Sequence, residues 1–166
     1  MPLRPTPDAL RERAFAVLGG ELDGVAFLDL YAGTGAVGLE ALSRGAGRVV
    51  SVEHHRAAAR LIEDNRQALG VDEATAAILV MPARRAVAEL ARRGQSFGLI
   101  WADPPFEDWE DGLLALREAA ELGVLAAGGT ACLECPDDAA VAGDARLQVV
   151  RDLGGGASRL VLLGRR

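Results

Sequence analysis

The sequence predicts the α/β class, with a doubly wound, mixed seven-stranded sheet that ends in a C-terminal antiparallel hairpin. Three observations lead to this prediction. Short apolar runs alternate with amphipathic segments along most of the chain, which is typical of a parallel sheet covered by helices. A G-x-G-x-x-G turn, Gly33–Gly38, follows the first run and opens the next amphipathic segment. The last two runs flank Gly154–Gly156, so we expect a hairpin on a Rossmann-like sheet.

Each element is predicted from its own pattern. Thr6 and Pro7 indicate an N-cap and first position of a helix that stops at Gly19–Gly20. Runs bounded by glycine, proline or acids indicate buried strands, and segments with helical spacing follow them. In chain order we expect a helix over 6–18, then strands over 25–31, 48–53, 74–82, 96–106 and 128–136 alternating with helices over 33–46, 54–70, 83–94 and 110–125, and a hairpin over 146–166.

The length of 166 residues predicts a single domain over 1–166, with residues 1–20 as a helical lead-in and 146–166 as the hairpin. Half of the residues are hydrophobic and a quarter are charged, as in ordinary globular proteins. The sequence shows neither an apolar run of membrane-spanning length nor a signal peptide's apolar region, which predicts a cytoplasmic protein.

The net charge of −6 argues against indiscriminate nucleic-acid binding through charge alone. The sequence contains no lysine, so every Lys/Arg position is arginine. The guanidinium of arginine suits bidentate contacts with phosphate. Several clusters are best explained as solvated faces, including those at 44–48, 84–85 and 92–93.

Two short pairs raise the possibility of metal or redox chemistry. Cys132 and Cys135 have C-x-x-C spacing, but on a strand over 130–135 they point to opposite faces, which indicates core cysteines. His54 and His55 are the only histidines, and neighbours on a helix do not share a face. We therefore predict no metal site.

The glycine turn predicts close approach of a ligand at a helix N-terminus. Glu53 lies twenty residues after Gly33 and can accept hydrogen bonds from ribose hydroxyls. This combination fits any adenosine-containing cofactor. Asp29 at the end of the first strand is unfavourable for a pyrophosphate but favourable for a sulfonium and an ammonium. The loop therefore favours S-adenosylmethionine over NAD.

The sequence Asp103-Pro104-Pro105-Phe106 follows another buried strand. Two prolines fix the backbone and can hold a carboxylate and an aromatic ring in a constant relation. Phe106 could stack on a flipped base, while Asp103 accepts from the exocyclic amine of that base. Such a site would act mainly by positioning and electrostatics.

These residues resemble the RsmD-type 16S rRNA guanine-N2 methyltransferases. The resemblance covers nearly the whole chain, through Arg4-Pro5-Thr6, LDLYAGTGAVGLEALSRGA at 28–46, Glu53 with Asn65, DPPF at 103–106, and Glu134. It implies a class I methyltransferase fold and transfer from S-adenosylmethionine to the exocyclic N2 of a guanine in small-subunit rRNA. It also implies a substrate that is a ribosomal subunit or assembly intermediate, and we expect a monomer without membrane partners.

Carried over by position, the resemblance implies three groups of site residues. They are cofactor-binding Asp29, Ala32, Gly33, Gly35, Glu53 and Ala83; catalytic Asp103, Pro104, Pro105 and Phe106; and substrate-binding Arg4, Thr6 and Phe106. The sequence departs from the family pattern in two places. Family members usually carry a basic Gly/Arg-rich segment ahead of the position that corresponds to Met1, and RNA affinity is expected to be lower without it. Pro82 precedes Ala83 where members carry an acid or amide, so backbone groups and apolar packing would hold the adenine.

Three other functions remain open. An amino-methyltransferase acting on adenine or cytosine in DNA or another RNA shares a D/N-P-P-aromatic motif, but such enzymes usually have a separate target-recognition region. A NAD-dependent oxidoreductase would also use the glycine turn. A non-catalytic RNA-binding factor could keep the same fold.

Overall fold

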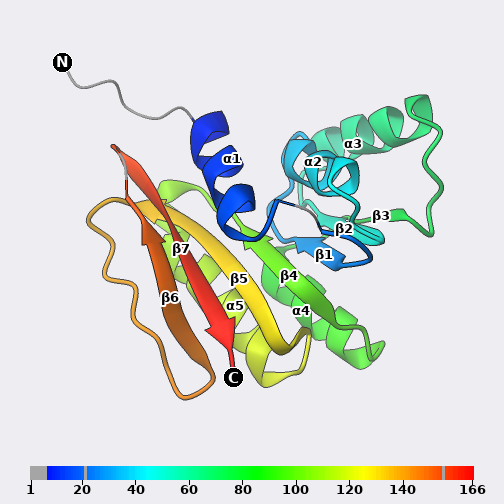
Figure 1. Cartoon of the computed structure of the whole chain (residues 1–166). Helices are drawn as coiled ribbons and strands as arrows, with labels where there is room; N and C mark the ends of the chain where they lie inside the picture. The colour runs from blue at the N-terminus through cyan, green and yellow to red at the C-terminus, as the bar shows by residue number, and fades with distance from the viewer. Residues whose placement is uncertain (1–6, 21, 155) are drawn as a thin grey trace.

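The computed structural model describes residues 7–20, 22–154 and 156–166, in which a seven-stranded sheet forms the centre of the molecule (Figure 1). Its strand order is β3-β2-β1-β4-β5-β7-β6; β7 pairs antiparallel with β5 and with β6, and the remaining neighbours pair parallel. The strands are β1 Ala26–Asp29, β2 Arg48–Val52, β3 Ala76–Leu79, β4 Phe97–Ala102, β5 Leu125–Pro136, β6 Leu147–Leu153 and β7 Ser158–Arg165. The predicted mixed sheet with a C-terminal antiparallel pair is confirmed.

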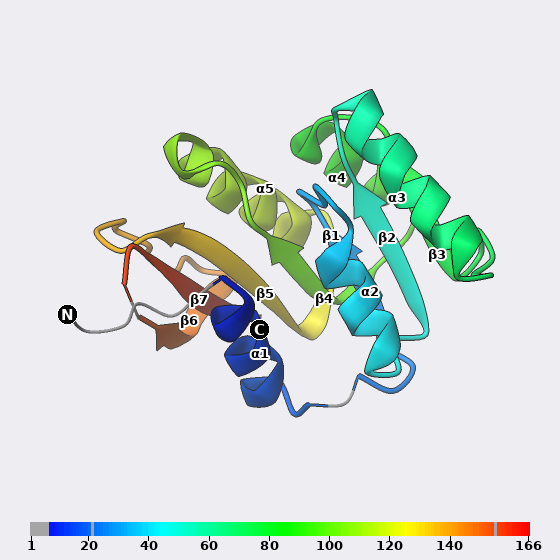
Figure 2. The ribbon, with the colours of Figure 1, turned by 90° about the horizontal axis from the view of Figure 1, so that it is seen from above.

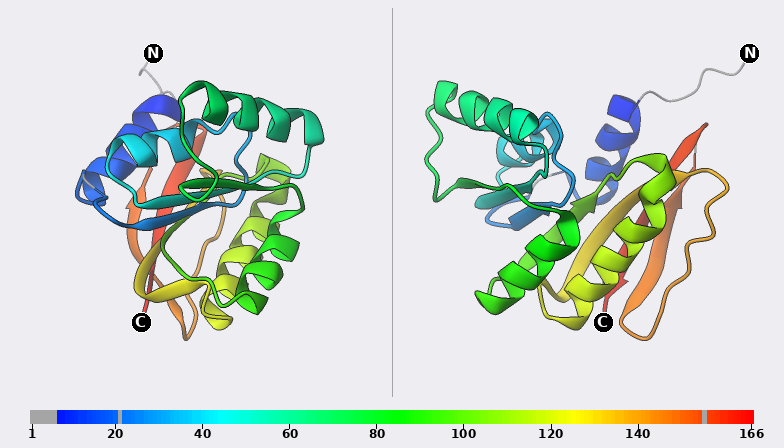
Figure 3. Two further views of the ribbon diagram at one scale, coloured as in Figure 1. Left: turned by 90° about the vertical axis from the view of Figure 1, so that its right-hand side faces the viewer. Right: turned by 180° about the vertical axis from the view of Figure 1, so that it is seen from behind.

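Helices cover both faces of this sheet. They are α1 Pro7–Val17, α2 Ala36–Ser43, α3 Arg56–Ala68, α4 Ala83–Arg92 and α5 Trp109–Glu121, with a 3-10 turn, η1, over Phe106–Asp108. Figure 2 shows α1 and α2 on one side of the sheet and α5 on the other, and Figure 3 shows α4 beside α5. Among the described residues, no helix combines the length and apolarity needed to cross a bilayer.

The two faces have separate hydrophobic cores. On the α4–α5 face, the core includes Leu116, Ile100 and Leu133, each fully buried. On the α1–α2 face, Phe15 of α1 stacks on Trp101 of β4, with ring centroids 5.6 Å apart and planes 11° apart. This stack fixes α1 beside the carboxyl end of β4.

Some predicted boundaries differ from the observed ones. Helix α3 begins at Arg56 rather than His54, because the chain is still extended at His55, which occupies the N-cap position. Strand β5 begins at Leu125, earlier than residue 128, because Gly123 in the left-handed region ends α5 and lets the chain enter the sheet at once. The predicted helix start at Thr6 lies outside the described residues, and α1 is described from Pro7.

The two cysteines lie on opposite faces of β5, as the alternation of a strand predicts. Cys132 belongs to the core beside α1, and Cys135 belongs to the core beside α5. Both thiols are free and buried, and burial raises the pKa of Cys132 above its usual range and that of Cys135 to about 11. They are core residues, and their alternation keeps them from sharing a site.

The register of the parallel strands brings four acids to one edge of the sheet. Strand β1 pairs Asp29 with Ser51 of β2 and Trp101 of β4, and β4 pairs Ala102 with Leu133 of β5. Asp103 and Glu134 are the next residues after Ala102 and Leu133 and lie level with each other, while Glu53 and Asp103 lie two residues beyond the partners of Asp29 on β2 and β4. These four acids, one from each strand, are Glu53, Asp29, Asp103 and Glu134.

Candidate functional site

Asp29 is a buried acid with one unsatisfied oxygen. Its side chain is only 1% exposed, and its Oδ1 accepts a hydrogen bond of 3.2 Å from the backbone N–H of Tyr31. Its Oδ2 is buried and has no hydrogen-bond partner among the described residues. A buried carboxylate oxygen without a donor is costly, so this atom fits a cationic or hydrogen-bonding ligand.

The glycine turn that follows β1 leaves open space at its first glycine. Gly33 and Gly35 have φ angles of 55° and 81°, in the left-handed region that side chains disfavour. A Cβ at Gly33 would meet no atom within 4 Å, whereas a Cβ at Gly35 would lie 3.2 Å from the Ile62 side chain. Gly33 thus faces open space, and Gly35 packs against α3 as the N-cap of α2.

Glu53 follows β2 and is held by the chain after it. Its Oε2 accepts from the backbone N–H of His55 at 3.2 Å, and its side chain is 8% exposed. The expectation that His54 and His55 point apart is wrong, because both precede α3 and their rings lie 3.8 Å apart. Their Nδ1 atoms are 3.8 and 3.6 Å from Glu53 Oε2, so the three side chains form one polar group.

A pocket of about 370 Å³ lies at this edge of the sheet and is large enough for a nucleoside-sized ligand. It brings together residues from four segments, at 30–33, 52–55, 81–83 and 103–105. The predicted residues that line it are Gly33, Glu53, Ala83, Asp103, Pro104 and Pro105. Tyr31, His54, His55 and Met81 complete its wall, and the sequence motifs did not identify these residues.

A second, smaller pocket of about 250 Å³ lies on the other side of the glycine turn. Ala32, Arg11 of α1 and the buried Trp101 line it. Gly33, Tyr31 and Asp103 line both pockets, so these residues form the partition between them. The site therefore consists of two adjoining compartments with Asp103 on their common wall.

Asp103 interacts with a second carboxyl group. Its side chain is hydrogen-bonded to that of Glu134, which in turn accepts from the Ser158 hydroxyl at 3.2 Å. Removal of its carboxyl from water, the neighbouring Glu134 and, more weakly, Asp29 raise the pKa of Asp103 to about 8. Asp103 therefore holds a proton near neutral pH.

Phe106 lies apart from the two pockets. It begins the 3-10 turn after Pro105, is 44% exposed, and lines neither compartment. Two predicted substrate residues, Arg4 and Thr6, lie outside the described residues. The structure thus brings Asp103, Pro104 and Pro105 to the pocket and leaves Phe106 at its rim.

Helix α5 approaches the two prolines closely at Gly112. A Cβ at this position would lie 2.8 Å from Pro104 Cγ and 3.3 Å from Leu133 Cδ1. We expect Gly112→Val to lower the free energy of unfolding by about 2–3 kcal/mol through overpacking. The exposed Leu114→Val on the same helix should cost less than about 0.5 kcal/mol. Urea unfolding measures the free energy of unfolding of both variants. An equal loss of stability in the two would show that contact with Pro104 does not cause the loss in Gly112→Val.

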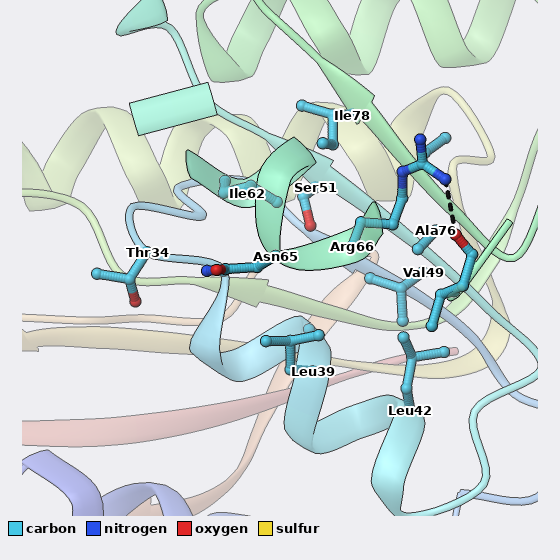
Figure 4. A pocket seen from close by; sticks show the side chains of 14 residues that line it. Thr34, Leu39, Leu42, Val49, Ser51, Ile62, Asn65, Arg66, Ala76 and Ile78 are labelled. Atoms are coloured by element: carbon cyan, nitrogen blue, oxygen red, sulfur yellow. Dashed lines mark hydrogen bonds between the residues drawn. The ribbon is translucent and has the colours of Figure 1, made fainter. Parts of the chain in front are cut away.

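A separate pocket lies between α2, α3 and strands β2 and β3 (Figure 4). Its lining is mostly apolar, with Ile62, Leu39 and Ile78 around it, and Arg66 closes one side by donating to the Val71 carbonyl at 2.7 Å. Gly35 lines this pocket and not the larger compartment beside Glu53. Gly35 therefore supports the turn by packing against α3.

Burial alters the titration of Asp29 in the free protein. Desolvation is the main cause that raises the pKa of Asp29 to about 7, and the charge of Glu53 adds to it. The folded state therefore binds a proton more tightly than the unfolded state, in which the pKa is 3.8, so stability falls as the pH rises towards and beyond 7.

We expect this group to lower the free energy of unfolding by about 2 kcal/mol between pH 5.5 and 8.5, and Asp29→Asn to remove that part of the dependence. Urea titrations of both proteins at several pH values give the difference. If the free energy of unfolding depends on pH in the same way for both proteins, Asp29 titrates as an ordinary carboxyl.

The strand order and the pocket at the carboxyl ends of β1, β2 and β4 define a protein with the class I methyltransferase fold. The chain belongs to the family whose model is described as "Conserved hypothetical protein 95", which matches residues 1–163. This confirms the resemblance to the RsmD-type family.

Curated relatives and a solved structure agree with this assignment. The chain is 35% identical over 105 residues to the "Putative rRNA methyltransferase YlbH" of Bacillus subtilis, covering 63% of this chain and 56% of the relative. It is 36% identical over 104 residues to the "Ribosomal RNA small subunit methyltransferase D" of Escherichia coli K12, covering 63% and 50%. The chain spans about half the length of the curated relatives it matches. A "Putative methyltransferase yhhF from Escherichia coli" superposes with a TM-score of 0.83 at 28% identity, over 99% of this chain and 88% of that one.

Proposed function

We propose that this chain, as a single methyltransferase domain over 1–166, transfers a methyl group from S-adenosylmethionine to the exocyclic N2 amine of a guanine in small-subunit (16S) rRNA. The observation that carries the proposal is that the buried Asp29, at the end of β1, keeps an Oδ2 without a hydrogen-bond partner among the described residues, while Asp103 lines both compartments. A carboxylate that lacks a donor fits a cationic methyl donor, and a carboxylate on the wall common to two compartments fits the amine that accepts the methyl group.

Residues of β1 and of the two compartments have the groups that the cofactor requires. Asp29 would accept from the ammonium of the methionine end, and the open space at Gly33 and the neighbouring Ala32 would allow the chain of the cofactor to pass. Glu53 would accept from the ribose hydroxyls. Ala83, at the start of α4, would pack on the adenine from the side where Pro82 leaves no polar side chain. Gly35 would contribute by holding the turn.

At the partition, Asp103 would accept a hydrogen bond from the guanine N2 amine. Pro104 and Pro105 fix the backbone there, and α5 packs on Pro104. Phe106, at the rim, would stack on the ring of a base that enters from solvent. Arg4 and Thr6 would contact the RNA near the mouth.

S-adenosylmethionine supplies an electrophilic methyl group on a sulfonium. The N2 lone pair forms the new bond to that methyl carbon, while the carbon–sulfur bond breaks and its electron pair stays on sulfur. N2 would then lose one proton, and a carboxylate oxygen of Asp103, on the common wall, would accept it. Orientation of the amine and stabilisation of its developing positive charge are the contributions of the protein.

The proposed partner is 16S rRNA within the small ribosomal subunit or an assembly intermediate, with the enzyme as a monomer in the cytoplasm, where ribosomes are assembled. Despite the net negative charge, Arg56, Arg60 and Arg85 are exposed at the starts of α3 and α4. Within the described part of the chain they form no ion pair, so they are available for phosphates.

The deciding experiment uses small ribosomal subunits from a strain that lacks this gene. Purified protein and methyl-labelled S-adenosylmethionine should label one guanosine, which mass spectrometry of digested RNA identifies as N2-methylguanosine. Subunits from the parent strain should accept no label, because the position is already modified. Label on adenine, cytosine or duplex DNA would overturn the substrate assignment. Thermal stabilisation by NADH and none by S-adenosylhomocysteine would overturn the reaction class.

A further inference from the structure

Glu134 is an acid that the proposed chemistry does not yet explain. It follows Leu133 on β5, and Leu133 is in register with Ala102 on β4. Glu134 therefore lies level with Asp103 on the neighbouring strand, about 5 Å away in the backbone. Two residues earlier on the two strands, Trp101 and Cys132 pair and belong to the core on the α1 face. Side chains two residues apart on a strand point to the same face, so Asp103 and Glu134 also point to the α1 face.

The position of Glu134 is constrained by its contacts. Its Oε1 accepts from the hydroxyl of Ser158, the first residue of β7, at 3.2 Å, and its carboxyl is hydrogen-bonded to Asp103. Arg159, the next residue after Ser158, instead donates to the carbonyls of Asp137 and Ala139. Within the described part of the chain, Asp103 and Glu134 are thus held from β7 without a cation.

We propose that Asp103 and Glu134 together read the guanine edge, with Asp103 accepting from N2–H and Glu134 accepting from the adjacent N1–H. This rests on the proposed function and assigns guanine specificity to Glu134. Guanine presents two neighbouring donors at these positions, and two adjacent carboxyls offer matching acceptors. Adenine and cytosine present a ring-nitrogen lone pair beside the amine, which an acidic oxygen repels.

The titration of Asp103 agrees with this geometry. Among the described residues, the acids that face Asp103 are Glu134 from β5 and Asp29 from β1, and they add to desolvation in raising its pKa to about 8. From α1, Arg11 lines the same compartment, but its guanidinium is paired with Glu40 and Asp8. The proton on Asp103 limits the negative charge at this site while leaving oxygen lone pairs for both donors of guanine.

The test replaces the target guanine by 2-aminopurine in reconstituted small subunits. 2-Aminopurine keeps the N2 amine, but its N1 is an acceptor. For the unmodified enzyme we expect kcat/KM to be about 10- to 100-fold lower on 2-aminopurine than on guanine. In Glu134→Gln, the amide can donate a hydrogen bond to N1 of 2-aminopurine. We therefore expect kcat/KM on 2-aminopurine to equal or exceed kcat/KM on guanine. Glu121→Gln, an exposed acid at the end of α5, is the control and should keep the preference of the unmodified enzyme.

A second measurement does not depend on activity. Carbon-13 NMR of labelled aspartate carboxyls should show the titration midpoint of Asp103 moving to lower pH in Glu134→Gln, since a neighbouring charge is lost. If the unmodified enzyme methylates guanine but Glu134→Gln keeps its preference, or the midpoint stays in place, the inference is wrong while the proposed function stands. If the unmodified enzyme methylates neither base, the proposed function itself fails. A preference that is lost or reversed in Glu134→Gln, together with a lowered midpoint of Asp103, supports the inference.

Discussion

Replacing Asp103 by alanine should lower the rate of methyl transfer by about 10²- to 10³-fold, which is typical for loss of one preorganised electrostatic contact to the reacting group. Asp103 lies on the wall common to both compartments, and its carboxyl is the acceptor proposed for the N2 amine. Asp103→Asn should retain more activity than Asp103→Ala, because the amide oxygen can still accept one hydrogen bond. Single-turnover kinetics on deficient small subunits measures the effect.

Two controls separate this effect from unfolding or loss of cofactor. Glu107→Ala removes an exposed acid four residues along the chain and should change the rate less than about three-fold. Asp103→Ala itself should bind S-adenosylhomocysteine and unfold at a temperature no lower than that of the unmodified protein, because a desolvated acid is removed. Unchanged methylation by Asp103→Ala would leave a non-catalytic RNA-binding role as the better explanation of the fold.

The second large effect is expected at Asp29. Asp29→Asn should weaken S-adenosylhomocysteine binding by about 30- to 100-fold, or about 2–3 kcal/mol, since it removes the charge proposed to pair with the ligand ammonium. In the unmodified protein, affinity should rise about ten-fold from pH 6 to pH 8, because the carboxyl, whose pKa is about 7, must be ionised to bind a cation. In Asp29→Asn this rise should be absent. Calorimetry in two buffers with different ionisation enthalpies should show release of a proton on binding near pH 6.5.

Asp64→Asn, an exposed acid on α3, is the matched control and should leave both the affinity and its pH dependence unchanged. A pH-independent affinity for the unmodified protein would mean that Asp29 does not meet the ammonium. Binding of NADH with the opposite pH trend would indicate an anionic ligand and contradict the choice of cofactor.

The sequence predicts the architecture well because its signals are local. Alternating apolar runs and amphipathic segments identify parallel strands, and parallel strands bring their carboxyl ends to one edge. That rule suffices to place Gly33, Glu53 and Asp103 around one pocket. The Asp-Pro-Pro motif is also local, since two prolines restrict the backbone wherever they occur.

The features that sequence reasoning missed depend on contacts between distant segments. Glu134 reaches Asp103 only because β4 and β5 share a particular register, for which no motif gives a signal. His54 and His55 come together because α3 starts two residues later than its pattern indicates. Phe106 lies at the rim because the chain enters a 3-10 turn after Pro105, and the motif alone predicts only a rigid turn.

The row of acids at the ends of β2, β1, β4 and β5 has a consequence for evolution and engineering. Two of them, Asp29 and Asp103, bind protons more tightly than free carboxyls because their charged forms are unfavourable in the folded protein without ligand. Selection for heat resistance alone would therefore favour neutral replacements at these positions. The resulting proteins would be more thermally stable but unable to turn over substrate. The persistence of such acids in a thermally selected library is a measure of how strongly activity, rather than folding, constrains this edge of the sheet.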